Sequence, residues 1–227
     1  MPRHHPLLAS AALAASMTLA ARPAGAAIDL SLDPVAGVVE VGDAVEIRLV
    51  AASDTGGLAF SAAIDAILAW DPGFLTLVGT SQAGAVPLLS AGFPAFQPLN
   101  EASPPADGDA LFTALAPLGD PIDVTPGGVL VTTFLFEAIA ETPATAIELP
   151  ATLGGYATTV FDGIVPNLDV TGLLAGTSIT VIPSPGAAIL LGIFLRSFGG
   201  PTRRRHCRGA TTPKFHRTPL PVGTAGR

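Results

Sequence analysis

The sequence is poor in the residues that carry most catalytic chemistry. Its single cysteine, Cys207, excludes a disulfide within the chain and any cysteine-cluster metal site. The four histidines (His4, His5, His206 and His216) all lie near the two ends, so no histidine-based triad or metal site can form in the long central segment. Phosphate-loop, dinucleotide and Gly-x-Ser-x-Gly motifs are also missing. We therefore expect a protein that is not an enzyme.

Basic residues are almost missing from the middle of the chain. Between Asp29 and Asp169, Arg48 alone stands against all eighteen Asp and Glu residues, which gives this stretch a net charge of −17. The other ten Lys and Arg residues lie toward the two ends. An acidic domain repels phosphate backbones, so we exclude nucleic acid as a partner. The acidic surface is interpreted as a solvated one, with collection of divalent cations such as Ca²⁺ as the alternative.

Aromatic side chains make up only 6% of the chain, with Trp70 and Tyr156 as the sole tryptophan and tyrosine. Trp70 ends a long apolar run, so we expect it in the hydrophobic core. This scarcity disfavours a strong platform for stacking sugars.

Acidic residues cluster in turn-like segments, where we interpret them as side chains that bond their own backbone. They are Asp43, Asp54, Asp71, Asp107, Asp109, Asp120, Asp123 and Asp162. Asp107-Gly108-Asp109 most resembles a fragment of a calcium loop, so Asp107 and Asp109 are candidate Ca²⁺ ligands, although the other ligands of an EF-hand are missing. No other cofactor is expected. Glycoside hydrolysis remains an alternative because it needs only two carboxylates.

The N-terminus has the features of a secretory signal peptide over residues 1–26. A short positive start is followed by an apolar run over residues 7–21, which is shorter than the roughly 20 residues of a membrane span. Ala24-Gly25-Ala26 supplies the small-x-small pattern of signal cleavage, with Ala24 and Ala26 as the recognised residues. We therefore expect an exported protein.

Residues 27–182 are expected to form one acidic all-β domain. Short alternating or apolar runs bounded by Gly, Pro and Asp predict about ten strands. The clearest cover 28–32, 38–41, 44–52, 58–70, 74–78, 129–139, 147–149, 156–161 and 178–182. In 44–52 the odd positions should face the core, and 129–139 should run through the middle of a sheet. Residues 58–70 and 79–90 could instead hold short helices. The pattern favours an antiparallel β-sandwich.

The order of motifs in this segment resembles the cohesin domain. Val41-Gly42-Asp43 precedes an alternating strand, Trp70-Asp71-Pro72 ends another, and the Gly-Val-Leu-Val-x-x-Phe-x-Phe-x-Ala strand at 128–138 is followed by Gly-x-x-Ile-Thr-Val at 176–181. The resemblance implies a nine-stranded jelly-roll sandwich that binds a partner through a sheet face or supports carbohydrate-related assembly.

Cohesins bind dockerin modules, but this sequence shows neither a dockerin nor a second cohesin repeat. The expected function is surface interaction in a non-enzymatic cell-envelope or extracellular-matrix protein, with a protein or polysaccharide partner. The alternative is a carbohydrate-binding module, a class that shares the sandwich shape.

The C-terminal region 183–205 resembles the PEP-CTERM sorting signal of exported bacterial proteins. Its residues are Pro183, Ser184, Pro185 and Gly186, then an apolar run over 187–195, then Arg203, Arg204 and Arg205. The resemblance implies processing by an exosortase-type enzyme and transient membrane association through both ends. The apolar run is only about half of a span. A basic segment, 206–227, follows, and we expect it to be disordered. A frame-shifted remnant or a plain basic tail are the alternatives.

Overall fold

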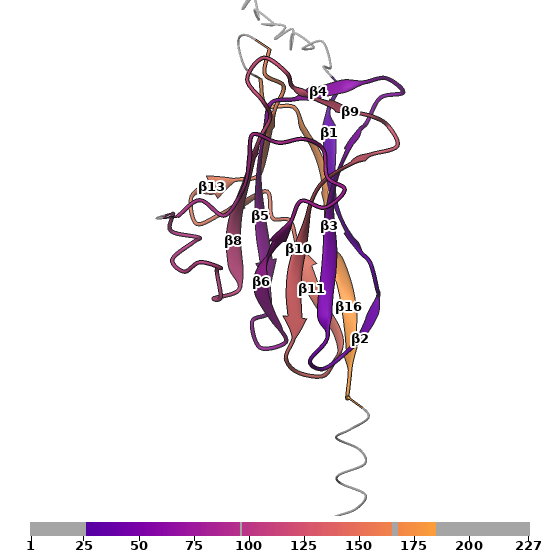
Figure 1. The fold of residues 1–227 in the computed structure, drawn as a ribbon, viewed down its shortest axis with the longest axis vertical. Helices are drawn as coiled ribbons and strands as arrows, with labels where there is room; N and C mark the ends of the chain where they lie inside the picture. The colour runs from indigo at the N-terminus through magenta and orange to yellow at the C-terminus, as the bar shows by residue number, and fades with distance from the viewer. Residues whose placement is uncertain (1–25, 96, 165–167, 185–227) are drawn as a thin grey trace, which may run out of the picture. The chain divides into compact units, whose positions relative to one another are not determined.

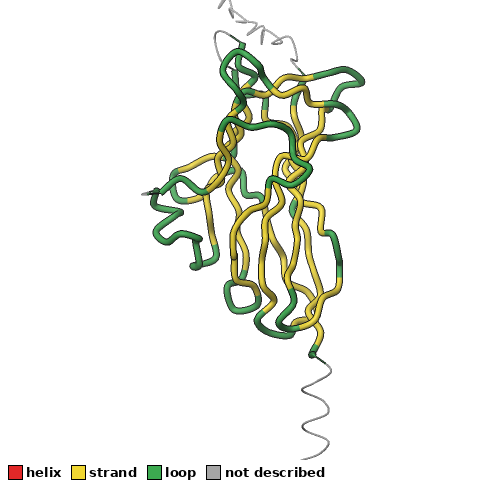
Figure 2. Tube along the Cα trace, in the orientation of Figure 1, coloured by secondary structure: helices red, strands yellow, loops and turns green. Residues whose placement is uncertain are grey.

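The computed structural model describes residues 26–95, 97–164 and 168–184 and contains only strands and loops there (Figures 1 and 2). The first eight strands are β1 (Ile28–Pro34), β2 (Val38–Glu40), β3 (Ala44–Ser53), β4 (Ala59–Ser61), β5 (Ala63–Trp70), β6 (Leu75–Ser81), β7 (Ser90–Gly92) and β8 (Asp109–Leu115). The other eight are β9 (Ile122–Val124), β10 (Val129–Ala138), β11 (Thr142–Glu148), β12 (Thr152–Leu153), β13 (Tyr156–Ala157), β14 (Thr159–Phe161), β15 (Thr171–Ala175) and β16 (Thr177–Ile182). Within these residues no helix has the length and apolar character needed to cross a membrane.

Two sheets form the body of the domain. The five-stranded sheet has the order β15-β1-β3-β10-β6, and the seven-stranded sheet has the order β2-β16-β11-β5-β8-β7 with β14 paired to β5. Two small ribbons, β12-β13 and β4-β9, lie outside them. Most pairs are antiparallel, as predicted, but β1 pairs with β15 and β2 with β16 in parallel.

One hydrophobic core joins the inner faces of both sheets. Its largest fully buried rings are Phe112, Phe134 and Phe136. Phe112 on the seven-stranded sheet meets Phe134 on the five-stranded sheet edge to face at 5.2 Å. Trp70 packs in the same way on Phe136 at 5.4 Å and is 7% exposed, which confirms its predicted place in the core. Such aromatic pairs across the two layers fix the sheets against each other.

The alternation in the sequence accounts for the strands that were predicted most clearly. In β3, Val45, Ile47 and Leu49 are buried while Glu46 and Arg48 are exposed, as expected from a period of two. β10 lies between β3 and β6 and is mostly buried, which confirms its predicted central place.

The two suggested helices are wrong. The 58–70 run forms β4 and β5, because its alternate residues Ile64, Ala66 and Leu68 all fill the core. The 79–90 segment continues β6 and then turns toward β7, since Gly79, Gly84 and Pro87 disfavour a helix.

Several acidic residues form turns as predicted. The Asp43 carboxylate accepts from the Glu40 N–H, and that of Asp71 accepts from the Gly73 N–H at 2.8 Å. Two others do not: Asp109 begins β8 and Asp123 lies within β9, so their assignment to turns is corrected.

Candidate functional site

The outer face of the seven-stranded sheet is divided into a covered and an open part. Residues directly opposite each other on paired strands share a face. Along β5 the outward positions are Ala63, Asp65, Ile67 and Ala69, as the burial of the intervening residues shows. The covering begins at Ile67, which is outward yet fully buried.

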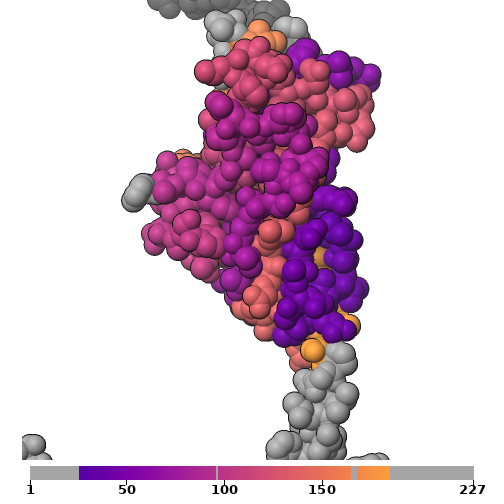
Figure 3. Space-filling view, viewed as in Figure 1, coloured from indigo at the N-terminus to yellow at the C-terminus, as the bar shows by residue number. Residues whose placement is uncertain are grey.

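A second, smaller hydrophobic cluster covers this middle part. Ile67, Leu111 on β8 and Leu99 from the 93–108 loop are buried together, and Leu153 and Tyr156 from the β12-β13 ribbon pack on them. The ribbon turns through Gly154 and Gly155, both with positive φ (58° and 87°), as a tight two-residue hairpin requires. Figure 3 shows the magenta 93–108 loop as part of a lobe on the side of the domain.

Buried hydrogen bonds hold both covering segments in place. The Asn100 Nδ2 group donates to the carbonyls of Pro94 and Leu111, and its Oδ1 accepts from the Leu111 N–H, all at 2.9 Å. Asn100 thus pairs with β8 beyond the end of β7, as a strand would. The Tyr156 hydroxyl donates to Gln97 Oε1 at 2.7 Å and ties the ribbon to the loop.

Thr158 supplies a hydrogen-bond partner to β5 where the β12-β13 ribbon interrupts the pairing of neighbouring strands. β11 and β14 both pair with β5, at Ala69–Trp70 and Ala63–Asp65, and the ribbon is inserted between them. The Thr158 hydroxyl accepts from the Ile67 N–H at 3.1 Å and donates to the Pro150 carbonyl at 2.7 Å. The Ile67 N–H therefore keeps a hydrogen-bond partner at the point where neither β11 nor β14 pairs with β5.

The open part, which we call the open half-face, consists of the outward side chains nearest the start of β5. Cross-strand pairing places them in two rows: Phe161, Ala63 and Leu115 in the first, and Thr159, Asp65 and Thr113 in the second. Leu115 is 38% exposed, and the register of β7 places Ser90 opposite it, at the end of the first row. The first row thus contains three apolar side chains on neighbouring strands, of which Phe161 and Ala63 are half-buried and Leu115 is exposed.

One polar pair orients the second row. The Thr113 hydroxyl donates to Asp65 Oδ1 at 2.7 Å. Arg48, the only base among residues 26–184, lies on the outer face of the five-stranded sheet, in a cavity with Glu46 and Leu135. The open half-face therefore combines apolar side chains with a negative charge that no base of the described residues offsets.

The predicted calcium ligands are only partly brought together. Asp107 is exposed, whereas Asp109 is half-buried with one carboxylate oxygen, Oδ1, buried and without a hydrogen-bond partner. Burial, and then the charges of Asp107 and Glu101, raise the pKa of Asp109. Across the described ranges no three His, Cys, Asp or Glu side chains gather as a metal site would need. Calcium binding here stays a prediction.

The remaining predicted residues lie at or beyond the edges of the described domain. Ala26 begins it, and Ala24 lies outside the described residues. Pro183 and Ser184 follow β16, whereas Pro185, Gly186 and the arginines Arg203, Arg204 and Arg205 lie outside. The signal peptide and the sorting signal therefore stay predictions.

The residues of the open half-face were not singled out from the sequence. Asp65 lies within the long apolar run 58–70, at an outward position. Recognition of a period of two in 63–70 could have found Asp65, but not its neighbours on β8 and β14, which only the strand register brings there.

Comparison of the sequence with protein-family models and with curated proteins finds no match. Solved structures do match. The seventh ScaB type I cohesin from Pseudobacteroides cellulosolvens aligns with a TM-score of 0.50 at 12% identity, covering 79% of this chain and 98% of that chain. A chain of a type I cohesin–dockerin complex from Clostridium thermocellum aligns with a TM-score of 0.50 at 13% identity, covering 69% and 99%. The domain is thus a cohesin-like jelly-roll β-sandwich, which confirms the predicted fold.

Proposed function

We propose that this chain is an exported, non-catalytic interaction module that binds a protein partner through the open half-face. The observation that carries the proposal is the apolar row of Phe161, Ala63 and Leu115, which lies beside the Asp65–Thr113 pair on the seven-stranded sheet. A contiguous row of apolar side chains that are half-buried (Phe161, Ala63) or exposed (Leu115) favours protein contact. The cohesin-like fold adds support, because one matching solved structure is a cohesin–dockerin complex.

The charge of the domain indicates the chemistry of the partner. The stretch from Asp29 to Asp169 has a net charge of −17. A partner surface that presents basic side chains around an apolar centre would complement it, and its association would weaken as salt screens the charges. A dockerin is one candidate class of partner, since a matching solved structure is a cohesin–dockerin complex.

A matched pair of variants tests the proposal. Chemical cross-linking of the full chain in an extract of the source organism, read out by quantitative mass spectrometry, should identify a partner that Leu115→Asp loses. Leu135→Asp, which places the same change on the outer face of the five-stranded sheet, should retain it. A partner that both variants capture equally would exclude the open half-face as the binding surface.

The protein partner is favoured over the polysaccharide partner by the placement of the aromatics. Trp70 is buried against Phe136, and the Tyr156 hydroxyl is bonded to Gln97 within the covered part. A glycan array with the full chain checks this choice. Binding of a glycan that Leu115→Asp abolishes would assign the surface to sugars instead.

We further propose the division into a signal peptide over 1–26, a sandwich over 27–182, a sorting segment over 183–205 and a basic segment over 206–227. This organisation implies export to the cell envelope or beyond and processing by an exosortase-type enzyme. Mass spectrometry of the mature protein tests it directly. A mature chain that begins after Ala26 and ends near Gly186 supports it, and an unprocessed chain contradicts it.

A further inference from the structure

Three peptide bonds of the chain join an aspartate to a following proline. They are Asp33–Pro34, Asp71–Pro72 and Asp120–Pro121. The carboxylate of such an aspartate can attack its own main-chain carbonyl carbon, because the ring that forms has only five members. Proline favours this reaction, since its nitrogen belongs to a tertiary amide and leaves as a basic secondary amine. The three bonds are equivalent in the sequence, but their surroundings in the structure differ.

The Asp33–Pro34 bond is held in a sheet. Both residues belong to β1 and are paired with β3. The pairing continues on the far side of the bond, where the Val35 N–H donates to the Glu46 carbonyl at 2.9 Å. Attack on the Asp33 carbonyl carbon ends the planarity of the peptide unit and would distort this ladder. The ladder also keeps the two sides of the bond together, so we expect a broken bond to close again.

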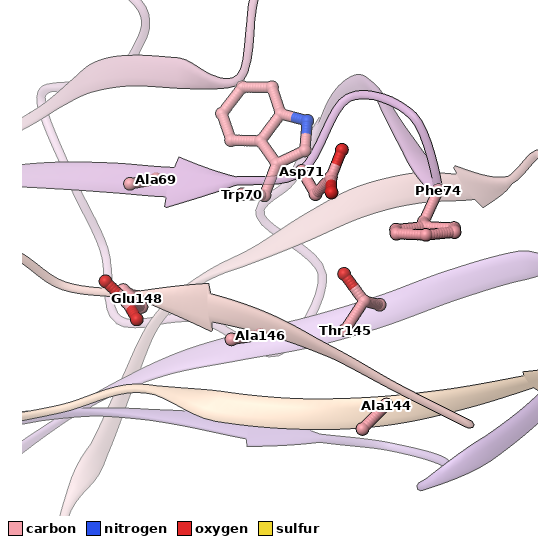
Figure 4. A pocket seen from close by; sticks show the side chains of 8 residues that line it. All are labelled: Ala69, Trp70, Asp71, Phe74, Ala144, Thr145, Ala146 and Glu148. Carbon is pink, nitrogen blue, oxygen red and sulfur yellow. The ribbon is translucent and has the colours of Figure 1, made fainter. Parts of the chain in front are cut away.

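The Asp71–Pro72 bond is held in the turn after β5. Figure 4 shows Asp71 at the beginning of this turn, which leads from Trp70 to Phe74. Asp71 Oδ1, one of the two oxygens that could attack, accepts from the Gly73 N–H at 2.8 Å. The Asp71 carbonyl accepts from the N–H groups of Phe74 and Leu75 at 3.1 and 3.2 Å. These three hydrogen bonds span the bond and hold the leaving proline beside the carbon that it leaves.

The Asp120–Pro121 bond lies instead in the exposed 116–121 loop between β8 and β9. The Asp120 N–H donates to the Pro117 carbonyl at 3.1 Å, in a turn whose third residue, Gly119, has a φ of 78°. The Asp120 side chain is exposed, and Leu118 in the same turn is 94% exposed. Among the described residues, neither the carboxylate nor the carbonyl of Asp120 has a hydrogen-bond partner. Both reacting groups are therefore free to approach each other.

We propose that Asp120–Pro121 is a self-cleavage site of this chain. A carboxylate oxygen of Asp120 bonds to the Asp120 carbonyl carbon, and the carbon–nitrogen bond to Pro121 breaks. The electron pair of that bond stays on the Pro121 nitrogen, which takes a proton from the acidic solvent and becomes a new N-terminus. A cyclic anhydride remains on Asp120, and one water molecule opens it to the side-chain carboxyl and a new C-terminal carboxyl. This inference does not depend on the proposed function.

The cut should leave the sandwich assembled, because both fragments contribute strands to both sheets. β10 follows the cut yet lies between β3 and β6, which precede it. Phe112 before the cut meets Phe134 after it at 5.2 Å in the core. Exposed loop tips tolerate such nicks. The expected product is one domain made of two chains, residues 1–120 and 121–227.

Incubation of the full chain in mildly acidic buffer, followed by intact mass spectrometry, tests the assignment. The pH is the lowest at which the near-UV circular dichroism of Trp70, the only tryptophan, remains native. Folded protein should be cut at Asp120–Pro121 at least about ten-fold faster than at the two held bonds, because about 1.4 kcal/mol of local opening slows a reaction ten-fold. Chain unfolded in urea at the same pH should be cut at all three bonds at similar rates. Folded protein that is cut equally at the three bonds, or not at Asp120–Pro121, overturns the proposal.

Variants test the role of the carboxylate. Asp120→Asn removes the intramolecular nucleophile and should slow scission of this bond at least about ten-fold. Asp123→Asn is the matched control, because it removes the same charge from a nearby exposed residue that Val124 follows, and it should be cut at the wild-type rate. An Asp120→Asn protein that is cut as fast as wild type overturns the mechanism.

Size-exclusion chromatography of the cut protein tests the expected product. The two fragments should elute together in native buffer and separate only in urea. Fragments that separate in native buffer would contradict the two-chain domain.

Discussion

Asn100 is the side chain on which the covered part of the sheet most depends. It is 4% exposed and makes three hydrogen bonds, two of them to the backbone N–H and C=O of Leu111. Asn100→Ala leaves both groups of Leu111 without their partner. Each orphaned backbone group costs about 1–3 kcal/mol, so the upper limit is about 6 kcal/mol. Because the 93–108 loop can lift and admit water, we expect a loss of about 2–4 kcal/mol.

Urea unfolding of the full chain measures this loss, and hydrogen exchange locates it. Exchange at the Leu111 amide should accelerate most, while the Thr180 amide, which donates to the Gly37 carbonyl, should change only as far as global stability falls. Gln82→Ala is the matched control, because its amide is exposed and bonds the Thr132 hydroxyl away from the loop. If Asn100→Ala loses no more stability than Gln82→Ala, Asn100 does not hold the loop on β8.

Two further predictions concern the turn before β8. Gly108 has a φ of 103°, and a Cβ there would lie 2.8 Å from the Trp70 carbonyl oxygen. Gly108→Ala should therefore lower the unfolding free energy, measured by thermal melting, by at least about 1–2 kcal/mol. Gly37→Ala is the control and should cause no such loss, because a Cβ at Gly37 would meet open space. Because the pKa of Asp109 is raised by folding, the unfolding free energy falls as the pH rises through the interval between its ordinary and raised values. Asp109→Asn should therefore raise the melting midpoint at pH 7 but not at a pH below both values, and equal gains at the two pH values would contradict this origin.

The sequence predicts a strand correctly where one face of that strand is buried and the other is exposed to solvent. The alternation in 44–52 placed Val45, Ile47 and Leu49 correctly, because Glu46 and Arg48 mark the solvent side. β8 was missed for the opposite reason. Its inward residue Phe112 and its outward residue Leu111 are both buried, the latter beneath a loop, so the strand lacks alternation.

The candidate site depends on contacts that local sequence does not encode. The open half-face needs the register of β14, β5 and β8, which places Phe161, Ala63 and Leu115 in one row. The role of Asn100 depends on a loop folding back onto a strand eleven residues later. Nothing around Asn100 in the sequence distinguishes a buried asparagine from one in an exposed turn. Pairing partners, rather than periodicity, therefore define both features.

Two threonines on the same side of β5 offer a final comparison. Thr158 and Thr145 each lie where the 142–161 segment departs from β5, but only the Thr158 hydroxyl is bonded. Thr158→Val leaves the Ile67 N–H and the Pro150 carbonyl without partners and should cost about 2–4 kcal/mol. Thr145→Val removes an unsatisfied buried hydroxyl and should be neutral or stabilise by up to about 1 kcal/mol. Urea unfolding of both variants measures the difference. A loss at Thr145 equal to that at Thr158 would mean that its hydroxyl already has a partner in the free protein.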